Sequence, residues 1–200
     1  MKTKAAAPSA PPLSPFLEQA LAELRGIRAD AAAVTEGLTP AQLAWSPGPG
    51  RWSIAEVVAH LNLAGRVYLD AIAHAAAGAR TRGLADRGDY RPSLAGRAMA
   101  WALRPDQRIR MKAPAIFRRP EGTAAIDGPR ELATWRALHV EMEERLREAA
   151  GLDLRRARFV SPASGLVRMN LGDAFSVLLV HERRHLGQMR NVRGSPGFPA

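Results

Sequence analysis

Apolar residues recur at every third or fourth position in four stretches of the chain, and this spacing restricts the fold more than any other feature. The first stripe contains Leu17, Leu21, Leu24, Ile27 and Ala31, which places five apolar side chains on one helix face. The four stripes predict long helices over residues 14–36, 53–78, 129–151 and 170–192. A helix with one apolar face must bury that face, so four of them predict an all-α four-helix bundle.

Capping signals mark where the predicted helices begin. Ser14 precedes a proline, which suits an N-cap followed by the first helical turn. Ser53 and Glu56 have the spacing of a capping box, and Asn170 with Asp173 resembles one. These signals set the helix starts independently of the apolar pattern.

The connections differ greatly in length. Residues 38–52 and 152–169 are predicted to be loops, and no segment reads as a convincing strand. Residues 79–127 are irregular, with a short helix predicted over 93–103 and an extended segment over 108–120. A connection of this length suits a crossover that lets the second and third long helices run parallel.

Length and composition limit the remaining possibilities. The 200 residues suit one domain, predicted over 14–193, with a disordered tail at 1–13 and a flexible tail at 194–200. The chain has no cysteine, which excludes disulfides, thiolate metal ligands and a thiol nucleophile of its own. No apolar run is long enough to cross a membrane, and prolines interrupt any signal-peptide core near the start. We therefore expect a cytoplasmic protein with no membrane partner.

The net charge of +10 raises the question of nucleic-acid binding. Only three of the 29 basic residues are lysines, and the arginines are scattered with no run of five. Such scatter indicates compositional bias rather than a binding stripe. We expect no nucleic-acid partner.

The sequence HERRH, residues 181–185, carries the strongest chemical signal. Two histidines four positions apart lie on one helix face, so both rings can reach a single metal ion. The letters also match the zinc-protease helix, but the further ligand that those enzymes need is missing. Gln188 and Asn191 stand at the metzincin positions, and no aspartate or glutamate follows Glu182.

A third ligand must therefore come from upstream. If the second and fourth long helices are antiparallel, His60 stands level with His181 and His185. His139 falls at the centre of the third stripe and is either a ligand, a residue behind the ligands, or a core side chain. The alternative for each of these histidines is a hydrogen-bonded core residue without metal.

Three segments together resemble the DinB-like superfamily of helical-bundle metalloproteins. They are RWSIAEVVAHLNLAGRVYL, MKAPAIF and NLGDAFSVLLVHERRHLGQMRNV, and the resemblance spans about residues 14–193. It implies an up-down-down-up bundle and a metal triad of His60, His181 and His185. Members of this family include transferases of low-molecular-weight thiols (bacillithiol, mycothiol, glutathione) and metal-dependent hydrolases, and some members bind without catalysis.

The resemblance implies one divalent ion, either zinc, nickel, iron or manganese, and a small-molecule substrate. Such an ion would ionise a thiol or a water near neutral pH. Glu182 is rotated about 100° from His181 and so points away from the ion, which favours thiol transfer to an electrophile over hydrolysis. A non-catalytic metal- or ligand-binding bundle is the third alternative, and a homodimer is left open.

Two further groups of residues are candidates around this site. The carboxylates of a thiol cofactor suit arginines, with Arg184 the first candidate; the others are Arg110, Arg183 and Arg190. Glu56 lies one turn before His60, where it would either orient the imidazole ring or serve only as the capping partner of Ser53.

Overall fold

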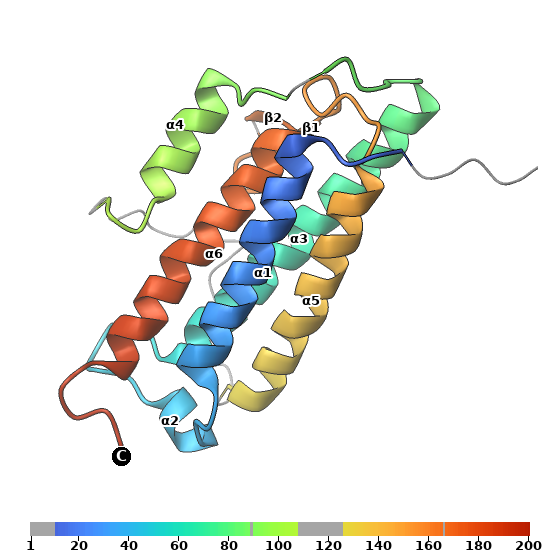
Figure 1. The fold of residues 1–200 in the computed structure, drawn as a ribbon. Helices are drawn as coiled ribbons and strands as arrows, with labels where there is room; N and C mark the ends of the chain where they lie inside the picture. The colour runs from blue at the N-terminus through green and yellow to red at the C-terminus, as the bar shows by residue number, and fades with distance from the viewer. Residues whose placement is uncertain (1–10, 89, 108–125, 166) are drawn as a thin grey trace, which may run out of the picture.

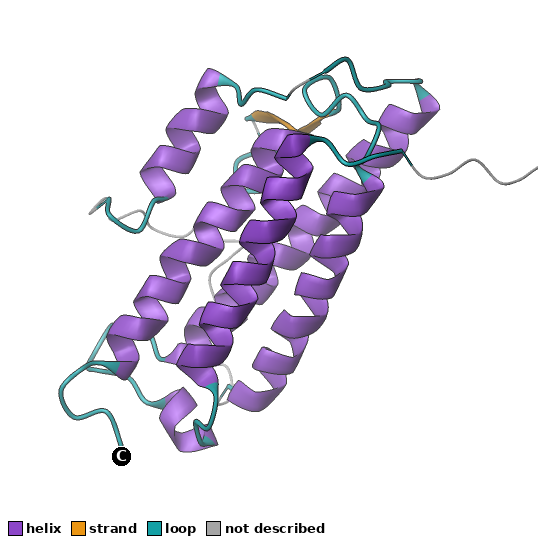
Figure 2. Ribbon diagram, in the orientation of Figure 1, coloured by secondary structure: helices purple, strands orange, loops and turns teal. Residues whose placement is uncertain are grey.

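The structure is a computed structural model that describes residues 11–88, 90–107, 126–165 and 167–200. Four long helices form the predicted bundle: α1 (Pro15–Thr35), α3 (Ile54–Thr81), α5 (Gly128–Glu148) and α6 (Leu171–Arg193). Figure 1 shows them side by side, and Figure 2 shows how little of the described chain is strand. The prediction of an all-α four-helix bundle is confirmed. None of the described helices is both long and apolar enough to cross a membrane.

Ion pairs and hydrogen bonds between the helices give their directions. Arg183 bonds Glu23, and ten residues later Arg193 donates to the carbonyl of Val34, so α6 runs parallel to α1. Asn62 donates to Glu131, so α3 and α5 start near the same end. In Figure 1, α1 and α6 begin at the top, whereas α3 and α5 begin at the bottom. This is the up-down-down-up order, and the long connection between α3 and α5 makes it possible.

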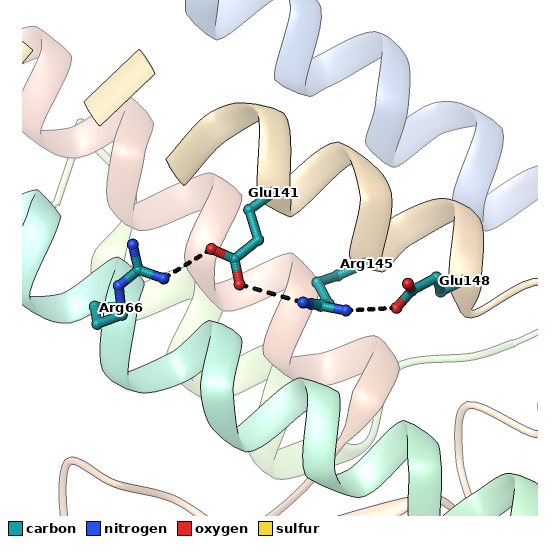
Figure 3. A network of polar contacts seen from close by, with 4 residues as sticks. All are labelled: Arg66, Glu141, Arg145 and Glu148. Atoms are coloured by element: carbon teal, nitrogen blue, oxygen red, sulfur yellow. Dashed lines mark hydrogen bonds and ion pairs between the residues drawn. The ribbon is translucent and has the colours of Figure 1, made fainter. Parts of the chain in front are cut away.

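A surface network of charges joins α3 to α5 (Figure 3). Arg66 donates to Glu141 at 2.8 Å, and Arg145 bridges Glu141 and Glu148 along α5. Individual exposed ion pairs contribute up to about 1 kcal/mol, so the network supports a packing that the buried apolar faces already determine.

The predicted helix starts agree with the capping contacts. Ser53 Oγ accepts from the Glu56 backbone N–H at 3.1 Å, and Glu56 Oε2 accepts from the Ser53 N–H at 2.8 Å. At the start of α6 only one of the two hydrogen bonds of the expected capping box forms. Asn170 Oδ1 accepts from the Asp173 N–H at 2.7 Å, but the Asp173 carboxylate binds the Asn170 amide and Ser93 instead.

Asp173 thereby links the connection between α3 and α5 to helix α6. Its carboxylate accepts from Ser93 N–H at 3.1 Å, from Ser93 Oγ at 2.6 Å and from the Tyr90 hydroxyl at 2.5 Å. Ser93 is also the N-cap of α4 (Leu94–Leu103), the short helix expected at this place, which packs along α6. The extended segment predicted over 108–120 lies outside the described residues.

Two predicted loops contain regular structure. Residues 38–52 include the short helix α2 (Pro40–Ala44), which the Thr39–Gln42 capping box and the proline at its start stabilise. Residues 152–169 contain part of a hairpin, β1 (Arg158–Val160) paired antiparallel with β2 (Arg168–Asn170). The prediction of no strand was wrong here, because three-residue strands are too short to show alternation and this pair forms against α3.

The end of α3 and the C-terminal segment differ from their predictions. Helix α3 continues three residues past Gly78, because Ala79 is fully buried in the core. The predicted tail at 194–200 contacts the bundle: the Phe198 ring lies 5.4 Å from that of Trp45, and Gln42 donates to the Pro199 carbonyl at 3.1 Å. The first ten residues of the tail predicted over 1–13 lie outside the described residues.

Candidate metal centre

Three histidines from two antiparallel helices meet inside one end of the bundle. His60 lies in the second turn of α3 and is buried, and His181 and His185 lie one turn apart on α6 and are partly buried. His181 Nε2 lies 3.2 Å from His60 Nε2 and 3.1 Å from His185 Nε2. One ring nitrogen from each residue lies within 4.8 Å of the other two. The register predicted for His60 thus brings the three imidazoles together.

These distances fit one shared metal ion. Two imidazole nitrogens that bind a tetrahedral ion at about 2.0–2.1 Å lie about 3.3 Å apart. The two Nε2 separations of 3.1 and 3.2 Å are close to that value. Among the described residues, no carboxylate joins this cluster. A metal ion held here would therefore have three imidazole nitrogens as ligands, with at least one coordination position left for another molecule.

The surroundings keep the imidazoles of His181 and His185 neutral. Burial, followed by the neighbouring rings of His185 and His60, holds the pKa of His181 well below its usual range. Burial and the His60 ring lower the pKa of His185 to about 3. A neutral imidazole has the free lone pair that a metal ligand requires, so no proton has to leave before binding at neutral pH.

Two side chains that the sequence did not single out as site residues support the cluster. Gln188 Oε1 lies 2.9 Å from His185 Nδ1, an arrangement in which Nδ1–H donates and Nε2 is left as the ligand atom. The indole of Trp52 lies nearly parallel to the His185 ring, with centroids 6.3 Å apart, and is 5.2 Å from His60. The sequence contained a signal for each of these two residues. Gln188 follows His185 by three positions, and Trp52 directly precedes Ser53, the N-cap of α3.

His139 and Glu182 form a second buried pair outside the cluster. Glu182 Oε2 accepts from Trp135 Nε1 at 3.0 Å and lies 3.4 Å from His139 Nε2. The ring of His139 also lies against the Trp135 indole, with centroids 3.8 Å apart. Glu182 therefore faces α5 and not the three histidines, as its rotation from His181 predicts. His139 is a buried residue of α5 that the structure does not bring into the cluster.

Glu56 and the candidate arginines have partners elsewhere. Glu56 accepts from the Ser53 backbone, the capping role. Arg184 donates to the carbonyls of Arg104 and Gln107 and so holds the end of α4 beside the cluster.

Arg183 and Arg190 lie away from the three histidines. Arg183 pairs with Glu23 and Asp30, and Arg190 pairs with Asp30, so both join α6 to α1. Arg110 lies outside the described residues. Of the arginine candidates in the described part of the chain, Arg184 is thus the one attached to the crossover next to the cluster.

Comparison with known proteins agrees with this architecture. Residues 23–189 match the sequence model of the DinB superfamily. The chain also resembles the structure of YfiT from Bacillus subtilis, described as a probable metal-dependent hydrolase with an unusual four-helix bundle topology. That match has a TM-score of 0.54 and 18% sequence identity, and covers 96% of this chain and 91% of YfiT. No curated protein sequence matches the chain significantly.

Proposed function

This chain belongs to the DinB superfamily, and we propose that it is a metal-dependent enzyme that transfers a low-molecular-weight thiol to an electrophile. In this proposal His60, His181 and His185 hold one divalent ion through their Nε2 atoms. The family, the description of YfiT and the spacing of the three nitrogens support the metal. The reaction class rests on the composition of the site.

The orientation of Glu182, away from the three histidines, is the main support for thiol transfer. Its carboxylate is bound to Trp135 and lies against His139, and no other described carboxylate joins the cluster. Hydrolysis commonly uses a positioned base to manage the proton of the attacking water. A divalent ion would by itself lower the pKa of a coordinated thiol enough to ionise it near neutral pH. The site therefore suits a thiol nucleophile, which the cysteine-free chain cannot supply.

The chain's own residues have distinct parts in this proposal. Gln188 fixes the tautomer and orientation of the His185 ring. Trp52 lies against His60 and His185 and excludes water from that side of the rings. Arg184 holds the end of α4 beside the site. The electrophile forms the new carbon–sulfur bond, its leaving group departs with the bonding electrons, and the thiol proton passes to solvent.

Hydrolysis is the second candidate, because YfiT is described as a probable metal-dependent hydrolase. It requires a base that the described residues around the cluster do not provide. A bundle that binds a metal or a small ligand without catalysis is the outcome if neither reaction occurs.

The test compares thiols and hydrolysable substrates on metal-loaded protein. Formation of the conjugate between chlorodinitrobenzene and glutathione, bacillithiol or mycothiol is followed for the wild type, His185→Ala and His74→Ala. His74 is an exposed histidine on the same helix as His60, which makes it the matched control. We expect acceleration in the wild type and His74→Ala but not in His185→Ala. Uncatalysed rates with all three thiols, together with metal-dependent cleavage of esters or amides, would favour hydrolysis instead.

A further inference from the structure

A hollow of about 520 Å³ lies on the surface between the C-terminal part of α3 and strand β1. Sites for small molecules commonly have volumes of about 300–1,000 Å³. The helix contributes residues between Ala71 and Arg82, and the strand contributes Arg158, Phe159 and Val160. The hollow is thus large enough for a small organic molecule.

Apolar and basic residues together line this hollow. Ala75 is buried, and Gly78 and Phe159 are half-buried, whereas Arg82 and Arg158 are exposed, as are the polar residues His74 and Thr81. No aspartate or glutamate lines the hollow among the described residues. Apolar lining residues beside two positive charges are complementary to a molecule with an apolar body and one negative group.

The two guanidinium groups are available to such a group. Arg82 uses Nε to donate to the Gly78 carbonyl, and Arg158 uses Nε to donate to the Arg155 carbonyl. No ion pair joins either side chain to a carboxylate within the part of the chain that the structure describes. Their terminal N–H groups therefore remain to bind a carboxylate or sulfonate, which guanidinium groups recognise in a planar fork.

The hollow is separate from the candidate metal centre. Its helical residues follow His60 by 11 to 22 positions along α3, which corresponds to about 16–33 Å at 1.5 Å per residue. None of the residues that line it belongs to the three-histidine cluster. A ligand held there would touch neither the three histidines nor Trp52.

We propose that this hollow binds a small amphipathic monoanion, such as a medium-chain carboxylate. The apolar chain lies on Ala75, Gly78 and Phe159, and the carboxylate pairs with Arg82 and Arg158. The proposal does not depend on the metal-dependent reaction, because it uses none of that site's residues.

Gly78 allows a sharp test by filling the space. A Cβ atom added at Gly78 meets no atom within 4 Å, and the backbone there is ordinary helix. Gly78→Trp therefore occupies the hollow without disturbing the core, and it replaces the poorest helix former after proline. The second variant, Arg82→Gln with Arg158→Gln, removes the charges but leaves the apolar lining residues. Arg97→Gln, an exposed arginine on α4, is the matched control.

Binding of decanoate and of uncharged decanamide to the full-length protein is measured by calorimetry and by amide chemical shifts. We expect decanoate to bind the wild type and Arg97→Gln equally, and the double variant about fivefold more weakly, as two exposed ion pairs allow. Decanamide should bind weakly, with the same affinity for the wild type and for the double variant, because it carries no charge. Gly78→Trp should abolish both interactions while its thermal unfolding temperature is no lower than that of the wild type.

Three results would overturn the proposal. One is the absence of decanoate binding at millimolar concentration, and another is equal decanoate affinity in the wild type, Gly78→Trp and the double variant. The third is sedimentation of the wild type as a dimer that Gly78→Trp dissociates, since the hollow would then be an interface between two copies of this chain.

Discussion

The indole N–H of Trp135 donates to the carboxylate of Glu182 at 3.0 Å, although Glu182 directly follows the candidate ligand His181. This contact joins α5 to α6 inside the bundle, where both side chains are buried. Because neighbouring residues on a helix are rotated by about 100°, holding Glu182 against α5 directs His181 and His185 toward His60 on α3. The pair thereby supports the rotation of α6 about its own axis that its buried apolar face determines.

Glu182→Leu should destabilise the protein by about 1–3 kcal/mol, because it leaves the buried Trp135 N–H without an acceptor. It should also weaken metal binding, since α6 then loses a contact that helps to hold His181 and His185 toward His60. Glu182→Gln keeps an acceptor oxygen and should retain most of both properties. Urea unfolding and metal titration measure the stability and the metal affinity of the two variants. Equal values for Glu182→Leu and Glu182→Gln would exclude this role for the carboxylate.

The metal content of the purified protein should be about one divalent ion per chain. His60→Ala and His181→Ala should each lower it strongly, because two imidazoles alone bind a divalent ion weakly at neutral pH. His74→Ala should retain the wild-type content. Elemental analysis of protein purified without chelator measures this, and a wild type free of metal, or full content in His181→Ala, would refute the ligand assignment.

Gln188→Leu should lower metal affinity roughly 10-fold or more, the usual cost of losing a hydrogen-bond partner behind a ligating histidine. The imidazole of His185 would lose the contact that holds Nδ1 protonated and Nε2 toward the other two rings. Competition with a coloured chelator measures the affinity, and Gln188→Glu, which preserves an acceptor, serves as the control. Unchanged affinity in Gln188→Leu would show that packing alone orients His185.

The stability of the metal-free protein should fall as pH decreases from about 7 to about 4. In the folded chain the pKa of His185 is lowered to about 3, and that of His181 is also lowered. The unfolded chain gains protons on these rings below its ordinary histidine pKa of about 6.5, whereas the folded chain does not. Acidification therefore favours unfolding. Urea midpoints across this range should decrease less in His185→Gln, and a parallel decrease in both proteins would contradict the assignment.

Double-stranded DNA and RNA should bind only weakly at physiological salt, despite the net charge of +10. In the described structure several arginines already pair with glutamates and aspartates, among them Arg28, Arg145 and Arg183. An anisotropy titration over a range of salt concentrations tests this. Submicromolar affinity with a steep salt dependence would show that the remaining charges form a nucleic-acid surface.

Local interactions made much of this protein predictable from its sequence. Helix periodicity and capping residues act within about four positions, so α1, α3, α5 and α6 were expected nearly where they lie. The pairing of His181 with His185 is equally local, since one turn of helix separates them. The position of His60 needed one added assumption, the antiparallel direction of α3 and α6, and the family resemblance implied the same order.

Tertiary packing decided the rest. The β1–β2 hairpin consists of strands too short to carry a pattern, and its three residue pairs form only where the bundle presents a surface. The partner of Glu182 lies 47 residues earlier on α5, and the carboxylate of Asp173 binds Ser93, 80 residues away, in addition to the Asn170 amide at its own helix end. Each of these polar groups is buried and must find a hydrogen-bond partner among whatever groups the fold brings near. Residue spacing along the chain does not contain that information, because distant partners become neighbours only after the apolar faces have packed.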